Sequence, residues 1–254
     1  MKVISTFGRI LFAAAIIGFG IQHFLCKGVV VGVELVPPWP PSHIFWGYLI
    51  AILLLLCGLS IAFRKAAVIA ALLLAILFFN AVVVLDLPKV LARVMDLTER
   101  TRFFESLSLG AGALIIAGGV VIGSRGLSRA LHICAMIGSW LFAISLIIFG
   151  TSHFLVPSFI ATLIPKWIQW HLFWAWFTGI AFVAAGVAIL LRRYAATAAC
   201  MLGIMFLAWV AVLHAPRIYA ALHSTAEWNS GLVALGMAGC SFALCSSTAV
   251  RRRL

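Results

Sequence analysis

The sequence predicts an all-α integral membrane protein with eight transmembrane helices, arranged as two parallel tandem four-helix bundles. Composition is the first observation behind this prediction: 65% of the 254 residues are hydrophobic and 9% are charged, whereas soluble domains carry about 25% charge. The second is a series of apolar runs of about 20 residues, the length that crosses roughly 30 Å of hydrocarbon as a helix. The third is an internal repeat that divides the chain in two.

The apolar runs follow one another along the whole chain. Their continuous Leu, Ile, Ala and Val composition is typical of membrane helices and differs from the short alternating strands of a membrane barrel. The first run has a repeat partner in the middle of the chain, so we interpret it as a retained helix and not as a cleaved signal peptide. The expected spans are residues 7–25, 44–63, 66–85, 103–122, 130–154, 170–191, 194–213 and 231–250.

The repeat is clearest around two histidines, where residues 16–25 (IIGFGIQHFL) return as residues 146–155 (LIIFGTSHFL). From the second to the end of the third helix of each unit the copies align at a constant offset of 128, and after a shorter loop in the second copy Glu105 best matches Asn229. The expected units are therefore residues 1–127 and 128–254. Because each unit has an even number of spans, we expect parallel copies related by a pseudo-two-fold axis along the membrane normal. The matched pairs include His23 with His153, His43 with His171, Arg64 with Arg192, Pro88 with Pro216, and Glu105 with Asn229.

The charges predict the orientation of the chain. Alternate loops collect eleven of the eighteen basic residues on one side and all six acidic residues on the other. By the positive-inside rule, both termini are then cytoplasmic, in a bacterial inner (cytoplasmic) membrane. The basic residues are split into pairs by the spans, which argues against a nucleic-acid partner and leaves membrane lipids as the expected one. The acidic residues are Glu34, Asp86, Asp96, Glu99, Glu105 and Glu227.

The six cysteines show no C-x-x-C spacing. A dithiol relay or a disulfide framework is therefore not expected. We interpret these residues as small, packed side chains of membrane helices.

Polar side chains gather at one end of each predicted unit. Ionisable groups at membrane depth are costly and often mark functional sites. In the first unit, His23, Asp86 and Glu105 are the candidate catalytic residues, because only this unit pairs histidines with carboxylates, an arrangement suited to proton transfer. The candidate ligand-binding residues of both units are His43, Trp39, Trp46, His153, His171, Trp167 and His214.

Each of these residues also has a simpler interpretation. A histidine near the interface can hydrogen-bond a neighbouring carbonyl or extend to water. The carboxylates can cap helix ends, and the tryptophans can form an ordinary interfacial belt. If the first unit carries the proton-transfer chemistry, the alternatives for the second unit are a partner site, a metal or haem position, or a degenerate scaffold.

Three motifs together resemble the DoxX-like family of bacterial four-helix membrane proteins. They are Gly20-Ile-Gln-His23-Phe24, Val36-Pro37-Pro38-Trp39 and His43-Ile-Phe45-Trp46, with counterparts at Gly150–Phe154, Ile164–Trp167 and His171–Trp174. The resemblance implies two fused four-helix units. It also implies a link to thiosulfate:quinone oxidoreductase, as in some relatives, or to methylamine dehydrogenase maturation, as in others. The chain lacks the vicinal cysteines expected for the maturation branch.

The first functional hypothesis is a redox-associated subunit that binds quinone or a similar isoprenoid near its outer face. His23 would hydrogen-bond the ring carbonyl, Asp86 or Glu105 would relay protons, and Trp39 and Trp46 would stack on the ring. Since no electron-carrier motif occurs, a soluble or membrane redox partner is expected, and whether the chain itself is an enzyme stays open. The alternative is a non-enzymatic lipid-binding, transport or membrane-assembly protein. Haem is a weaker alternative, because no c-type attachment motif occurs, and no metal site is predicted.

Overall fold

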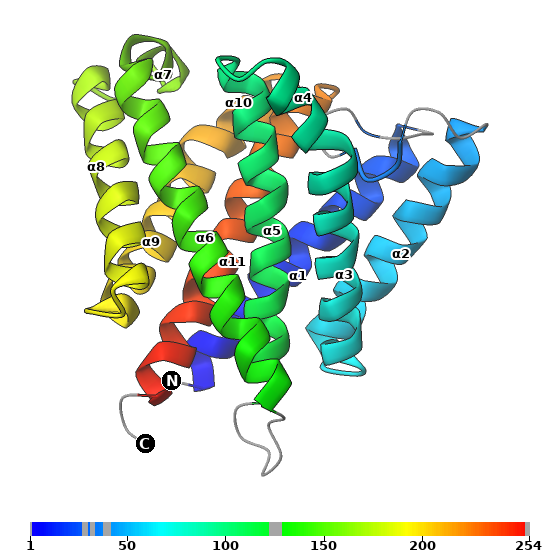
Figure 1. The fold of residues 1–254 in the computed structure, drawn as a ribbon. Coiled ribbons are helices and arrows are strands. Elements are labelled where there is room, and N and C mark those ends of the chain that lie inside the picture. Colours follow the sequence, from blue (N-terminus) through cyan, green and yellow to red (C-terminus); the bar gives the residue numbers. More distant parts are fainter. Residues whose placement is uncertain (1, 27–29, 31–33, 38–41, 122–128, 252–254) are drawn as a thin grey trace.

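The computed structural model describes residues 2–26, 30, 34–37, 42–121 and 129–251, and these residues form helices joined by turns and short loops, with no strand (Figure 1). The first half contains α1 (Lys2–Leu25), α2 (His43–Phe63), α3 (Ala67–Ala81), the π-helical turn η1 (Val82–Asp86), α4 (Leu87–Ala92) and α5 (Leu97–Val121). The second contains α6 (Arg129–Leu155), α7 (Pro157–Leu163), α8 (His171–Leu190), α9 (Ala195–Trp209), η2 (Val210–His214), α10 (Ala215–Ala220) and α11 (Thr225–Arg251). The expected boundary at residues 127 and 128 lies outside the described residues.

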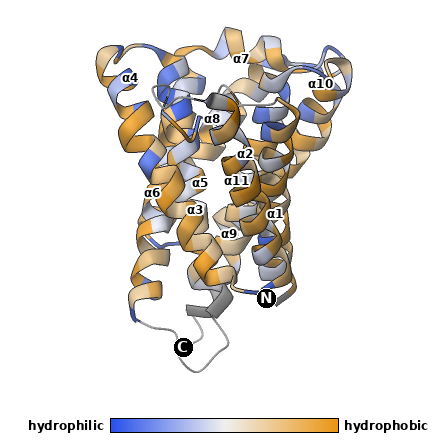
Figure 2. Cartoon of the chain, turned by 90° about the vertical axis from the view of Figure 1, so that its right-hand side faces the viewer, coloured by the Kyte–Doolittle hydropathy of each residue, from blue (hydrophilic) through white to orange (hydrophobic). Residues whose placement is uncertain are grey.

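Seven helical segments of the described residues are long and apolar enough to cross a membrane, so the chain is a multi-pass, all-α membrane protein. The helix α5 is as long as these segments, but its first turns carry Glu99, Arg100, Arg102 and Glu105. Hydrophobic residues dominate the length of the helices, and larger hydrophilic patches lie toward the end that carries α4, α7 and α10, called the upper end below (Figure 2). The seven segments are Val3–Leu25, Ile44–Phe63, Ala67–Ala92, Arg129–Leu155, His171–Leu190, Ala195–Ala220 and Thr225–Ser247.

The first two long helices of each half pack through matching small residues. A Cβ atom on Gly58 of α2 would lie 3.2 Å from the Ala13 carbonyl oxygen of α1. A Cβ atom on the corresponding Gly186 of α8 would lie 2.7 Å from the Ala143 carbonyl oxygen of α6. Small residues allow this close approach of helix backbones in membrane bundles. The same packing contact thus occurs in both halves.

The turn from the second to the third long helix is also repeated. It is as short as the sequence predicts, because α2 ends at Phe63 and α3 begins at Ala67. In the first half Arg64 and Ala66 have φ values of 61° and 54°, and in the second Arg192 and Tyr194 have φ values of 56° and 57°. These left-handed residues lie in connections of three and four residues, which reverse the chain between the two helices.

The two halves do not form two separate bundles. The helix α1 packs along α11 of the other half, α5 packs along α6, and α5 and α11 also touch each other. A Cβ atom on Gly8 of α1 would lie 2.7 Å from the Gly239 carbonyl oxygen of α11. One hydrophobic core therefore extends across both halves.

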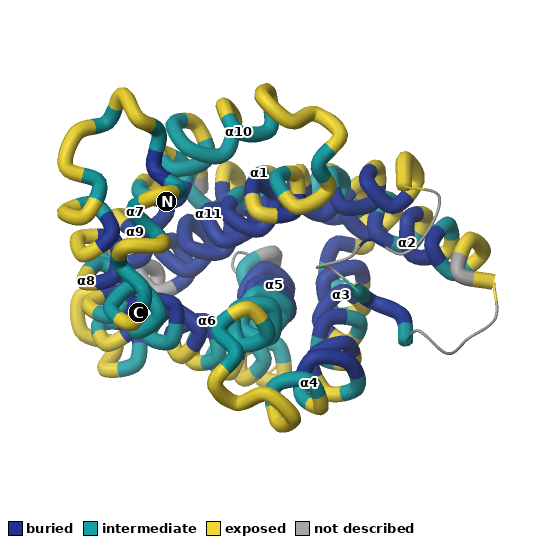
Figure 3. The backbone as a smooth tube through the Cα atoms, turned by 90° about the horizontal axis from the view of Figure 1, so that it is seen from above, coloured by how far each residue is buried: buried dark blue, intermediate teal, exposed yellow. Residues whose placement is uncertain are grey.

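This exchange places α5 and α11 between the outer helices of the two halves (Figure 3). In the apolar window of α11, 89% of residues are buried, against 22% in the span that contains α9. Each half of the molecule is consequently closed by one helix from the other half.

The third long helix of each half continues past the point where the sequence predicts its end. The spans were expected to end at residues 85 and 213, but α4 and α10 extend the helical path to Ala92 and Ala220. A proline lacks the N–H donor and its ring clashes with the carbonyl four residues earlier. Here the π turns η1 and η2, which precede Pro88 and Pro216, widen the helix and accommodate the ring.

Candidate functional site

The two repeated histidines are held by the same local contact. The Nδ1 atom of His23 lies 2.8 Å from the Phe19 carbonyl oxygen, and that of His153 lies 2.9 Å from the Phe149 carbonyl oxygen. Because a carbonyl only accepts, Nδ1 carries the hydrogen in each ring, and Nε2 of the neutral ring is left as an acceptor. The Nε2 atom of His23 is buried and has no hydrogen-bond partner among the described residues.

The π turns place a second polar residue in each half. Asp86 ends η1 and His214 ends η2, at matching positions of the repeat. One Asp86 carboxylate oxygen and the His214 Nδ1 atom are buried without a partner in the described part of the chain. Single π turns within α-helices often occur at functional sites, and a buried polar atom without a partner is costly unless a ligand or water satisfies it.

The structure brings Glu105 together with the histidines of the second half. A cavity of about 260 Å³ lies between α5, α6, α7, α8, α9, η2 and α11, and its polar lining includes Glu105, His153 and His214. Glu105 reaches this cavity because α5 packs on α6. Glu105 thus lies beside His153 and His214, and Asp86 of the first half also lies close enough to Glu105 for an electrostatic interaction.

Aromatic rings form much of the cavity wall. His153 makes an edge contact with Phe182, with ring centroids 5.3 Å apart, and Phe182 contacts Phe206 at 5.4 Å. Trp174 and Trp209 meet edge to face at 6.1 Å. Such walls favour a flat, partly apolar ring over a fully hydrated polar group.

The short helix α7 closes the upper end of this cavity. Ile160, Leu163 and Ile164 of this segment all line it. Its first residue is Pro157, a position that tolerates proline because the first helical N–H groups have no intrahelical acceptor. The sequence does not predict this helix, because seven residues are too few to show a helical period.

The equivalent region of the first half is more tightly closed. His23 is fully buried, whereas His153 is half-buried. Asn229 of α11 matches Glu105 in the repeat and is buried, and the neighbouring Thr225 accepts a hydrogen bond of 2.9 Å from Gln22. His23 and Asp86 of the first half are thus both buried, while the cavity of the second half combines two histidines with a carboxyl group.

The remaining predicted residues take varied positions. The Nε2 atom of His171 lies 3.1 Å from the Pro165 carbonyl oxygen, so this histidine holds the loop before α8. Trp46 is half-buried against Phe45 at 5.5 Å. His43 begins α2, and Trp39 lies outside the described residues. In the described residues no group of three His, Cys, Asp or Glu side chains is arranged to hold a metal ion.

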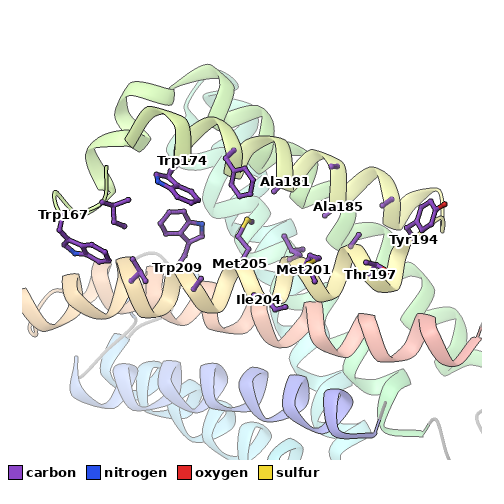
Figure 4. Close-up of a pocket in the computed structure, with 18 residues that line it drawn as sticks. Trp167, Trp174, Ala181, Ala185, Tyr194, Thr197, Met201, Ile204, Met205 and Trp209 are labelled. Atoms are coloured by element: carbon purple, nitrogen blue, oxygen red, sulfur yellow. The ribbon is translucent and has the colours of Figure 1, made fainter. Parts of the chain in front are cut away.

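A long groove runs between α8 and α9 beside the cavity, with a volume of about 880 Å³ (Figure 4). Trp167, a predicted binding residue, lines its upper end, and Tyr194 lines the other end. Trp174 and Trp209 line both the groove and the cavity. Trp209 is not among the residues predicted from the sequence, because its repeat partner is Ala81 and the tryptophan is therefore not repeated.

The comparisons with known proteins give one family match. The family described as Domain of unknown function (DUF8561) matches residues 142–237, which are less than half of the chain and run from α6 to α11. No curated protein and no solved structure matches the chain. The matched segment contains His153, His214 and both tryptophans that separate the cavity from the groove, but it does not contain Glu105.

Proposed function

We propose that the protein is a redox-associated membrane subunit that binds a quinone or a similar isoprenoid in the cavity of its second half. The observation that carries this proposal is the cavity itself, in which Glu105, His153 and His214 lie among aromatic side chains and beside an apolar groove. A flat ring with oxygen substituents and an apolar tail matches both environments. The resemblance to the DoxX-like family, some of whose members are linked to a quinone-reducing enzyme, supports the same class of ligand.

The tautomer of His153 indicates which form of the ligand fits best. Its Nδ1–H group donates to Phe149, so its neutral Nε2 atom accepts a hydrogen bond from a hydroxyl group. A quinol supplies such a hydroxyl. Oxidation of a quinol releases two protons and two electrons. In this proposal His153 and Glu105 accept the protons, and a partner dehydrogenase or other redox protein accepts the electrons.

The membrane arrangement belongs to the same proposal. With α5 as an eighth span, both termini lie on one side, and the lower end with Arg9, Arg64, Arg129 and Arg192 faces the cytoplasm of a bacterial cell. The ligand cavity then lies near the outer face of the inner membrane. The two halves are tandem copies whose fourth helices are exchanged.

Ligand extraction and titration test the function. Protein purified in a mild detergent is extracted for mass spectrometry, and a short-tailed quinol is then titrated while tryptophan fluorescence is recorded. We expect a retained isoprenoid quinone and saturable quenching through Trp174 and Trp209. His153→Ala should weaken binding at least tenfold, since a hydrogen bond to a ring nitrogen and aromatic contacts are lost, whereas the exposed His223→Ala should not change it.

Two results would count against quinone binding. One is the absence of both a retained quinone and saturable binding. The other is equal affinity of the wild-type protein and the His153→Ala variant. Recovery of a phospholipid in stoichiometric amount would instead favour the alternative, a lipid-binding or membrane-assembly protein.

A further inference from the structure

The groove between α8 and α9 is apolar along its whole length. Its lining combines small and flexible side chains, and several of them, including Met201, Ile204 and Phe177, are exposed on the outside of the bundle. Within the membrane proposed above, this surface faces the hydrocarbon of the bilayer. An apolar chain can therefore enter the groove sideways from the lipid phase.

The groove lies directly beside the polar cavity. Trp174 of α8 and Trp209 of α9 line both spaces, and their rings lie 6.1 Å apart in an edge-to-face arrangement. In the close-up these two rings lie near the end of the groove that also carries Trp167 (Figure 4). A molecule with its head in the cavity would lay its tail across this tryptophan pair into the groove.

The dimensions fit one hydrocarbon chain. On α8 the lining residues run from Trp174 to Ala188, which is about 21 Å at a rise of 1.5 Å per residue. Its volume of about 880 Å³ lies within the range of about 300–1,000 Å³ that is typical of pockets for one small molecule. One leaflet of the hydrocarbon core is only about 15 Å deep, so a chain that fills the groove extends beyond the bilayer midplane.

The first half has larger side chains at corresponding positions. Ala181 and Ala184 of α8 match Leu53 and Leu56 of α2 at the constant offset of the repeat. Both alanines line the groove. Each Ala-to-Leu difference adds three carbon atoms, so at these two positions the second half leaves more space between its helices than the first half does.

The geometry points to the α8–α9 groove as a binding site for a single isoprenoid tail longer than one leaflet, attached to the head group bound in the cavity. This inference rests on the proposed function and adds selectivity for the length of the tail. A phospholipid is a poorer fit, because each of its two acyl chains ends near the midplane. The apolar tail stabilises the complex through dispersion contacts with the alanine and methionine side chains that line the groove.

Two quinones that share one head group test this inference. A short-tailed and a long-tailed ubiquinone are incorporated at equal mole fraction in nanodiscs that contain the protein, and native mass spectrometry measures the ratio of the two complexes. The variant Ala181→Leu/Ala184→Leu fills the groove with the side chains that the first half carries. The reciprocal variant Leu53→Ala/Leu56→Ala serves as the control. Comparing variants in identical nanodiscs cancels any difference in membrane partitioning between the two quinones.

We expect the wild-type protein and the control to prefer the long-tailed quinone at least tenfold. We expect the filled variant to lose this preference and to keep its affinity for the short-tailed quinone. Equal binding of both quinones by the wild-type protein, or an unchanged preference in the filled variant, would overturn the tail site and leave the head site intact. The tail site would also be overturned if the wild-type protein were a dimer and the filled variant a monomer, because a second copy of the chain would then occupy the groove. Failure of both quinones to bind would overturn the proposed function itself.

Discussion

Glu105 and His153 line the same cavity although they belong to different halves of the repeat. Glu105 lies on α5, which packs along α6, and His153 lies near the end of α6. The carboxyl group and the imidazole are thus brought together by the contact between the two halves.

The contribution of this carboxyl group is tested by Glu105→Gln, which keeps the shape of the side chain and removes its charge. We expect affinity for a short-tailed quinol to fall about tenfold or more, because a hydrogen bond to a charged group contributes about 1.5–3 kcal/mol. Fluorescence titration measures the change. Glu99→Gln is the control, since Glu99 lies on the same helix, pairs with Arg102 at 3.9 Å and does not line the cavity. Equal losses of quinol affinity in both variants would show that affinity depends on the negative charge of this helix and not on the position of Glu105 in the cavity.

We expect the π turn before Pro216 to be needed for ligand binding in the cavity but not for the thermal stability of the protein. In Pro216→Ala the N–H donor returns and the ring clash disappears, so a regular helix becomes favourable. If the π turn becomes a regular α-helical turn, the residues after it shift by one helical position, and the direction of the His214 side chain changes by about 100°. We expect ligand affinity to fall strongly while the melting temperature stays equal or rises.

The matched variant for this experiment is Pro88→Ala, which makes the same backbone change in the first half. It should leave binding in the second-half cavity unchanged. Normal binding by Pro216→Ala would show that the π turn does not position His214.

Close helix packing predicts opposite effects for two glycines within helices. A Cβ atom on Gly186 would lie 2.6 Å from Ile147 and 2.7 Å from the Ala143 carbonyl oxygen, whereas one on Gly119 would meet no atom within 4 Å. We expect Gly186→Ala to lower the free energy of unfolding by about 1–3 kcal/mol. Gly119→Ala should raise it by up to about 1 kcal/mol, because alanine favours the helix. Reversible unfolding in mixed micelles compares the two, and equal effects would contradict the packing described.

The proposed orientation predicts which cysteine reacts from outside the cell. Cys26 is exposed and follows the end of α1 at the upper end, while Cys57 and Cys240 are buried. A membrane-impermeant maleimide added to intact bacteria should label the wild-type protein, and Cys26→Ser should abolish this labelling. Labelling of Cys26 only after cell lysis would place the upper end in the cytoplasm and reverse the topology.

Composition and local pattern predict the membrane class and several local features of this fold. The low charge and long apolar runs lead to the helical membrane protein, and Arg64 and Arg192 mark turns that the structure confirms. These features depend on short stretches of sequence. Which helices pack together cannot be predicted from such stretches, because glycines such as Gly8 indicate close packing without specifying the neighbouring helix.

The candidate site shows the same limit. The repeat led to the histidines at positions 23 and 153 and to residues 86 and 214, and these do lie near the upper end of their helices. Their grouping with Glu105 could not be derived, because it depends on the exchange of α5 between the halves. Trp209 and the groove were missed because they are differences between the copies, and a search for shared residues passes over them.

The exchange of α5 and α11 also bears on how such a chain could arise. In each half the first helix packs along the last helix of the other half, which is the contact expected between two subunits that exchange a helix. In a homodimer the residue that each subunit lends must be the same in both sites. After fusion that residue is free to differ, and here one site received Glu105 and the other Asn229.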